Sequence, residues 1–330
     1  DYFAILGVIF IIMSGMIASI NAGTLKVTVN DALGTNAAGT VIASGATLDL
    51  ANVTYSTTEA ITNNGGTLST STGTSSYAGV MTLGADSTID VDGTQLTIST
   101  AIGDGSNGYG ITKEGSGTLI LSGASTFSGD LTISAGTVTM TGTLADTVDV
   151  INSGTYDVDA SDTIQSLSGS GAVQIDTGVT LTTGDAGDDT ISGVISGAGN
   201  LTKAGAGTLT LSGTNTYTGD TTINAGTVKL TGNLNSATDL VIASGATLDL
   251  QAALTAATLD LDGTISNTAG TSSLVISGAS SLGGSITTTG IQTYTGAVTL
   301  TGHTTLATTS AKVTFSNTVN SEGSETNNLT

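Results

Sequence analysis

The sequence predicts an all-β protein whose chain winds into a parallel β-helix. A four-residue pattern, Thr–apolar–any–apolar, recurs along most of the chain, and longer stretches repeat almost unchanged. The composition points the same way, because Thr, Val and Ile favour strands whereas Gly, Asn and Asp favour turns. The 330 residues include 47 Gly and no Pro, and only 9% are charged, against roughly 25% in ordinary soluble proteins.

The first predicted element is a hydrophobic segment at the N-terminus. Phe3–Ile20 contains 18 residues without a charge, which is just long enough to cross a bilayer as a helix. A secretory signal would need a positive start, but Asp1 is the only charge there, and a helix that caps the first coil would be unusually apolar. We therefore treat residues 1–22 as a retained anchoring or assembly helix and residues 23–330 as the β-helix.

Two long repeats set the fold of the remainder. The 33 residues from Gly110 match those from Asn200 without a gap, so that Lys113 corresponds to Lys203 and Phe127 to Tyr217, 90 positions later. The string VIASGATLDL occurs twice, ending at Leu50 and Leu250. A β-sandwich would need no such literal copies, and the pattern of a leucine-rich repeat is absent.

The short pattern indicates how the strands stack. Its copies mostly begin 18–25 residues apart, which is typical of one strand per coil of a solenoid. Each strand would pair in parallel with its copy about 4.8 Å away, and the two apolar residues would point inward. Proline would be missing because nearly every strand is a central strand that needs its N–H group. The apolar residues expected to stack in successive copies are Leu209 and Leu211, then Val228 and Leu230, then Leu248 and Leu250.

The third position of the pattern predicts an outward column along the rod. Lys229 precedes Asp249 in it, as Lys26 precedes Asp49, and no two acidic residues are neighbours. Opposite charges one coil apart attract by about 0.2–1 kcal/mol per pair. We expect Lys229 and Asp249 on neighbouring coils, close enough for a salt bridge. The complete column reads Lys26, Asp49, Ser69, Asp90, Ile120, Thr139, Asp157, Thr182, Thr210, Lys229 and Asp249.

The charge balance excludes several classes of partner. The net charge is −21, and the five basic residues are all lysines, so no basic groove for nucleic acid can form. Anionic membrane surfaces are disfavoured for the same reason, which leaves the N-terminal segment as the only expected membrane contact. The chain has no cysteine and therefore no disulfides or thiolate metal sites.

The sequence contains no recognisable catalytic site. The single histidine, His303, is interpreted as a solvent-facing or corner residue. A polysaccharide lyase would need a basic residue at its site, but the chain has no arginine and we expect no lysine beside an acidic cluster. Acids two positions apart on a strand could bind Ca²⁺ or act as a glycosidase pair, and they occur at Asp90 and Asp92, Asp157 and Asp159, and Asp260 and Asp262. The weak candidate for Ca²⁺ is the loop with Asp185, Asp188 and Asp189. We expect no catalytic residues and no cofactor.

A family resemblance completes the sequence evidence. The run Ile191–Leu230 resembles the autotransporter-associated β-strand repeat of bacterial passenger domains, and Ile164–Ile175 resembles the linker between such repeats. The resemblance implies a right-handed parallel β-helix outside the cell, either secreted or associated with the outer membrane. One departure is that the chain ends at SEGSETNNLT without a segment long enough for a membrane barrel.

The favoured function is a non-enzymatic structural protein of the cell surface, a rigid stalk or filament subunit in adhesion or assembly. An alternative is a fragment of an autotransporter adhesin passenger domain, and a carbohydrate-active β-helix enzyme is less favoured. The expected partners are further copies of the chain, bound end to end or through residues 3–20, and a ligand on a host or neighbouring cell.

Overall fold

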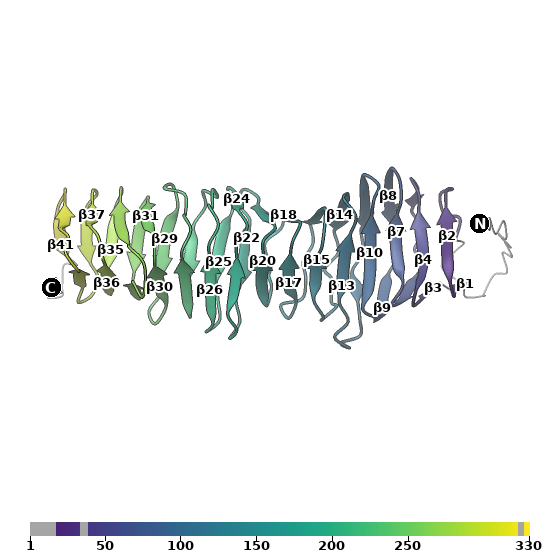
Figure 1. The fold of residues 1–330 in the computed structure, drawn as a ribbon, viewed down its shortest axis with the longest axis horizontal. Coiled ribbons are helices and arrows are strands. Elements are labelled where there is room, and N and C mark those ends of the chain that lie inside the picture. The colour runs from purple at the N-terminus through teal and green to yellow at the C-terminus, as the bar shows by residue number, and fades with distance from the viewer. Residues whose placement is uncertain (1–17, 34–38, 323–326) are drawn as a thin grey trace.

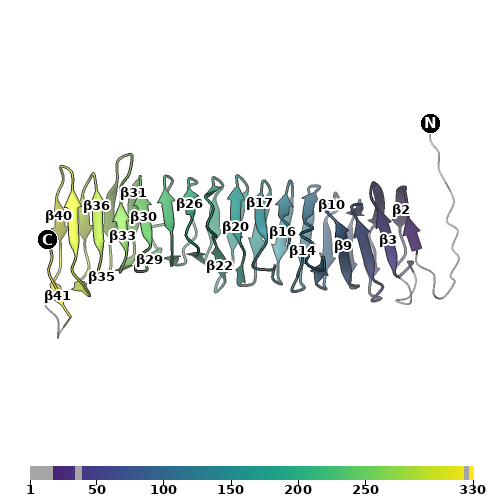
Figure 2. The ribbon, with the colours of Figure 1, turned by 90° about the horizontal axis from the view of Figure 1, so that it is seen from below.

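The chain forms a long rod made of β-strands that run across its axis (Figure 1). This computed structural model describes residues 18–33, 39–322 and 327–330. Every strand pairs in parallel with the corresponding strand of the coil before or after it, and the described residues contain no helix. The prediction of an all-β parallel solenoid is confirmed. Seen from a perpendicular direction, the rod keeps the same order of coils from one end to the other (Figure 2).

The first face of the solenoid is one sheet of 15 strands, which indicates 15 coils. Its parallel pairing satisfies the backbone N–H and C=O groups of each strand from both sides, which is why proline is absent. In order, its strands are β2 (Gly23–Val27), β4 (Ala46–Leu50), β7 (Thr67–Thr70), β10 (Ser87–Val91), β13 (Ile111–Glu114), β15 (Leu131–Ile133), β17 (Asp149–Asn152), β20 (Ser166–Gly169), β23 (Asp189–Ile191), β26 (Thr208–Leu211), β28 (Thr227–Leu230), β30 (Thr247–Leu250), β33 (Thr264–Ser266), β36 (Ser285–Thr288) and β39 (Thr305–Thr308).

The second and third faces are each divided into two sheets. The second face has β5 (Thr54–Tyr55), β8 (Thr74–Tyr77), β11 (Gln95–Ile98), β14 (Thr118–Leu121), β16 (Thr137–Met140), β18 (Thr155–Val158), β21 (Ala172–Ile175) and β24 (Ile195–Gly197), followed by β31 (Ala253–Ala256), β34 (Ser273–Ile276), β37 (Gln292–Tyr294) and β40 (Val313–Phe315). The third face has β1 (Ala18–Ile20), β3 (Thr40–Ala43), β6 (Ile61–Asn64), β9 (Met81–Ala85) and β12 (Ile102–Gly103), followed by β19 (Asp162–Thr163), β22 (Thr180–Thr183), β25 (Asn200–Lys203), β27 (Thr221–Ile223), β29 (Asp239–Ile242), β32 (Thr258–Leu261), β35 (Ser280–Leu282), β38 (Val298–Leu300) and β41 (Val319–Ser321).

The core consists of columns of apolar side chains that run along the rod. Leu209 lies opposite Val228, which lies opposite Leu248, and a second column joins Leu211, Leu230 and Leu250. All six side chains are fully or almost fully buried. Burying one such side chain contributes roughly 1.5–3 kcal/mol, so each coil is stabilised mainly by its two neighbours.

The two long repeats lie on different faces. The first copy begins with β13 on the first face, whereas the second copy begins with β25 on the third face. In each copy a loop replaces the strand of the face that is skipped, and a single β-bridge remains there, Ala124 with Thr143 in one and Thr214 with Asn233 in the other. The buried rings of Phe127 and Tyr217 belong to these two loops.

Glycine is required where the coils come closest. Gly136 and Gly226 have φ of +66°, and a Cβ atom at either position would lie 2.4 Å from a carbonyl oxygen, that of Gly117 or Gly207. A side chain at these turns would therefore face both an unfavourable backbone conformation and a steric clash.

The expected N-terminal helix lies mostly outside the described residues. Residues 1–17 are not described, and Ala18–Ile20, which the sequence interpretation placed in the helix, form β1 and pair with β3. The solenoid therefore already includes residue 18. Within the described ranges, no helix is long and apolar enough to span a membrane.

Candidate functional site

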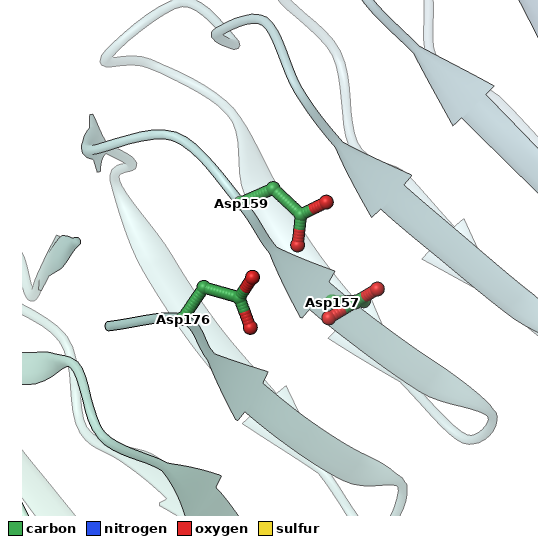
Figure 3. A group of neighbouring side chains, drawn as sticks. All are labelled: Asp157, Asp159 and Asp176. Carbon is green, nitrogen blue, oxygen red and sulfur yellow. The ribbon is translucent and has the colours of Figure 1, made fainter. Parts of the chain in front are cut away.

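Three aspartates from two neighbouring coils form the main acidic cluster of the described chain. Asp157 lies on β18, Asp159 follows that strand, and Asp176 follows β21 in the next coil (Figure 3). One carboxylate oxygen from each of the three lies within 4.8 Å of the others. Because Asp157 pairs with Gln174, the residue two positions after each reaches the same corner of the rod.

The three carboxylates of the cluster repel one another. The pKa of Asp157 is raised by burial and by Asp176, although a hydrogen bond from the Thr139 hydroxyl (3.1 Å) opposes this. The pKa of Asp159 is raised by burial and by both neighbouring carboxylates. One oxygen of Asp157, Oδ1, is buried and has no hydrogen-bond partner. Carboxylate oxygens at this spacing could hold a hard cation such as Ca²⁺.

The sequence pattern identified two of the three members of this cluster. It recognised Asp157 and Asp159 as a pair on one side of a strand, but it did not connect them to Asp176. The missing signal was the match between TYDV and AVQI on consecutive coils, which places Asp159 beside Asp176.

The acidic loop chosen from the sequence has a different arrangement. Asp185 accepts a hydrogen bond from the N–H of Gly187 (2.6 Å), and Asp188 accepts one from Thr208 (2.8 Å). Asp189 begins β23 and lies opposite the core residue Leu209. Among the described residues, the group of three acids with converging oxygens is the Asp157 cluster and not this loop. Calcium binding by Asp185, Asp188 and Asp189 stays a prediction.

The expected outward column is divided among the three faces. Its members up to Asp90 and from Thr210 onward lie on the first face, but Ile120, Thr139 and Asp157 lie on the second and Thr182 on the third. The short pattern marks a strand but does not say which face that strand occupies. In the true column Asp90 lies opposite Glu114, so two acids are neighbours after all. Burial, Asp92 and Glu114 raise the pKa of Asp90.

The lysine–aspartate pairs behave differently at the two positions. Lys229 and Asp249 lie opposite each other on β28 and β30. They do not form a salt bridge. The Asp249 carboxylate accepts hydrogen bonds from the Thr268 N–H and hydroxyl, as Asp49 does from Ser71, and it accepts a further one from Gln251. Within the described ranges, the ion pair shorter than 4.0 Å is the one between Lys26 and Asp49 (3.2 Å). The placement of Lys229 and Asp249 on neighbouring coils is therefore confirmed, but the salt bridge expected between them is not formed.

Two lysines that the sequence interpretation left unexplained are buried in the core. Lys113 donates hydrogen bonds from Nζ to the carbonyl oxygens of Glu114 (2.6 Å), Gly115 (2.9 Å) and Ala135 (3.2 Å). The equivalent Lys203 donates to Ala204 and to Gly205 (3.0 Å). These lysines supply donors to turn carbonyls that would otherwise be unpaired inside the rod.

Burial lowers the pKa of both lysines, that of Lys113 to about 8. Neighbouring carboxylates oppose this effect, Asp90 and Asp92 for Lys113, and the acidic loop beginning at Asp185 for Lys203. The expectation that no lysine lies beside an acidic cluster is therefore wrong. His303 is exposed, and its Nδ1 accepts a hydrogen bond from the N–H of Asn328 (3.2 Å).

Comparison with known proteins agrees with the family resemblance. The passenger-associated-transport-repeat matches twice, at residues 111–140 and 201–230, which are the two copies described above. The adhesin BmaC autotransporter of Brucella suis biovar 1 (strain 1330) is 41% identical over 144 residues, or 42% of this chain. The chain covers only 4% of the length of that relative. No solved structure matches the chain.

Proposed function

We propose that this chain is a segment of the passenger domain of an autotransporter adhesin, displayed on a bacterial surface as a rigid stalk. The observation that carries the proposal is that both transport repeats are built into one uninterrupted solenoid. Each repeat supplies two coils, and the 15-stranded sheet continues through both without a break. We further propose that the solenoid is right-handed, as almost all parallel crossover connections are.

The rod gains its stiffness from repetition. Each coil contacts only the coils before and after it, and a buried apolar column runs through every interface. Bending the rod would open these packed columns on one side, which costs buried apolar area. A stiff rod suits a stalk that must hold a binding surface away from a cell.

The proposed activity is non-enzymatic. The outward positions of the strands carry mainly Thr, Ser, Asn and Asp, so adhesion would depend on an extended polar surface. The net charge of −21 favours repulsion between neighbouring stalks and solubility outside the cell. Association end to end or through residues 3–20 stays a prediction, because residues 1–17 lie outside the described residues.

The test is surface display. The chain, with an epitope tag, is fused to the translocation barrel of an unrelated autotransporter and produced in a host that lacks adhesins. We expect tag labelling on intact cells, rods in electron micrographs and stronger attachment to cultured epithelial cells than the barrel alone confers. A destabilised variant, Lys113→Met combined with Lys203→Met, should reduce display because it lacks the buried amines that donate hydrogen bonds to the turn carbonyl groups. A chain that remains in the periplasm, or displayed rods that confer no attachment, would contradict the proposal.

A further inference from the structure

A small hollow lies on the first face where the first transport repeat begins. Its volume is about 250 Å³. The carboxylates of Asp86 and Asp130 and the hydroxyl-bearing residues Thr112 and Thr132 line it, together with backbone at Gly110. The lining is more polar than apolar, although Ile111 also borders it, and both acids are exposed to solvent.

The register of three strands explains how these groups meet. Ser87, Ile111 and Leu131 are opposite one another on β10, β13 and β15. The residues just before them, which are Asp86, Gly110 and Asp130, therefore stack at one corner of the rod. Because the middle position is a glycine, the two carboxylates are separated by a coil that carries no side chain there. Thr112 and Thr132 are neighbours on the adjoining outward column.

In the second repeat, a side chain fills the position that is equivalent to this hollow. Asn200 occupies the position of Gly110, and its Oδ1 accepts a hydrogen bond from the N–H of Asp220 (2.8 Å). Its Nδ2 donates to the Thr180 hydroxyl (3.4 Å). The asparagine thus spans the coils on both sides, whereas the first repeat has no side chain to do so. In the first repeat, Asp86 accepts a hydrogen bond from the N–H of Gly110 (2.9 Å).

The chemistry of the lining selects the ligand. Ionised carboxylates only accept hydrogen bonds, and threonine hydroxyls both donate and accept, so a ligand needs several O–H or N–H donors and no negative charge. Burial raises the pKa of Asp130, and the carboxylates of Asp149 and Asp86 raise it further, so Asp149 is an additional carboxylate nearby. A bare divalent ion would fill little of the space, because one water alone occupies about 30 Å³. The hollow is also below the roughly 300–1,000 Å³ of pockets for drug-sized ligands.

We infer that this hollow is a subsite for a single neutral or amino sugar ring of a surface glycan, held by the Asp86 and Asp130 carboxylates and the two threonine hydroxyls. Short O–H···O⁻ hydrogen bonds from the sugar hydroxyls to the carboxylates provide most of the recognition. The inference rests on the proposed adhesin function and specifies its ligand. The site takes one ring of a longer glycan, so binding of a single sugar is weak and adhesion depends on many stalks.

The experiment uses the purified full chain and saturation-transfer NMR with the methyl glycosides of glucose, galactose, mannose and glucosamine. We expect at least one glycoside to bind, and Asp130→Asn to weaken it at least about fivefold, as expected for the loss of a hydrogen bond to a charged group. The matched control is Asp220→Asn in the second repeat, where Asn200 fills the equivalent place, and it should leave binding unchanged. Thr112→Val with Thr132→Val should weaken binding without removing a charge.

Three results would overturn the inference. They are no saturation transfer to any of the four glycosides, equal losses for Asp130→Asn and Asp220→Asn, and calorimetric binding of Ca²⁺ alone that Asp130→Asn abolishes while no glycoside binds. Thermal unfolding of each variant checks that it is folded. Because the assay needs no cells, failure of sugar binding would overturn only this subsite, whereas failure of surface display would overturn the proposed function on which the subsite rests.

Discussion

The two transport repeats have closely related sequences and each forms two coils with a loop, yet their strands occupy different faces of the rod. The first begins on the first face and the second on the third, and each loop replaces a strand on the face that remains. The comparison teaches that the repeat encodes a local unit of two coils with a loop. Its place around the axis is not part of what the repeat encodes, because the two copies begin on different faces.

The repeats also differ in a pair of core residues that change together. Tyr217 and Thr221 share a buried hydrogen bond between their hydroxyl groups (2.6 Å) in the second repeat. In the first repeat the equivalent residues are Phe127 and Leu131, which are both fully buried and apolar. A buried hydroxyl without a partner is costly, so the two positions are physically coupled.

The largest expected loss of stability comes from replacing a turn glycine that both copies share. Gly136→Ala and Gly226→Ala should each destabilise the protein by about 2–5 kcal/mol, because the left-handed conformation costs about 1–2 kcal/mol and the clash with a carbonyl oxygen adds to it. Urea unfolding measures both. Gly245→Ala is the control, since φ is +82° but nothing lies within 4 Å of the added atom. If it proves as harmful as the other two, close packing of the coils is not the reason.

Replacing the buried lysines should reduce the stability of the protein by different amounts in the two copies. Lys113→Met leaves three carbonyl groups without this donor and Lys203→Met leaves two, so we expect losses of roughly 3 and 2 kcal/mol, at about 1 kcal/mol per hydrogen bond. Lys229→Met, at a partly exposed position, should change stability by less than about 0.5 kcal/mol. Urea unfolding of the three variants ranks them, and equal losses at all three positions would contradict a structural role for the buried amines.

Exchanging the aromatic residue of the coupled pair should destabilise both copies, by more in the first than in the second. Phe127→Tyr should cost about 1–3 kcal/mol because its hydroxyl would face Leu131, and adding Leu131→Thr should recover part of the loss. Tyr217→Phe should cost only about 0.5–1.5 kcal/mol. A double-mutant cycle by thermal unfolding measures the coupling. Strict additivity of Phe127→Tyr and Leu131→Thr would show that the positions are independent.

A pH dependence of stability is also expected at the first repeat. The folded pKa of Lys113 is about 8, below its ordinary value of 10.5, so the unfolded chain binds more protons between these values. Its contribution to stability therefore rises as the pH increases from 8 to 10.5 and is lost as the pH falls through 8. The stability of the protein relative to Lys113→Met should increase over this window. An unchanged difference across it would place the pKa of Lys113 at its ordinary value.

Sequence reasoning reached the fold because the strand pattern is local. The apolar alternation in TLTL, TVKL and TLDL, together with glycine turns, was enough to place Leu209, Val228 and Leu248 in one column. The candidate sites were harder to predict. The Asp157 cluster needs Asp176 from the next coil, and the hollow near Asp130 depends on a side chain that Gly110 does not have.

By itself the sequence determined that this chain forms parallel strands, that its coils are about 20 residues long and that its core is aliphatic, because strand periodicity and turn glycines are properties of short segments. Only the tertiary structure decided which face each strand occupies, which acids become neighbours and why Lys113 and Lys203 are buried. These depend on how strands of neighbouring coils pair and on where the chain skips a face, as it does beside Ala124 and Thr214. The short strand pattern reads the same on every face and does not record either.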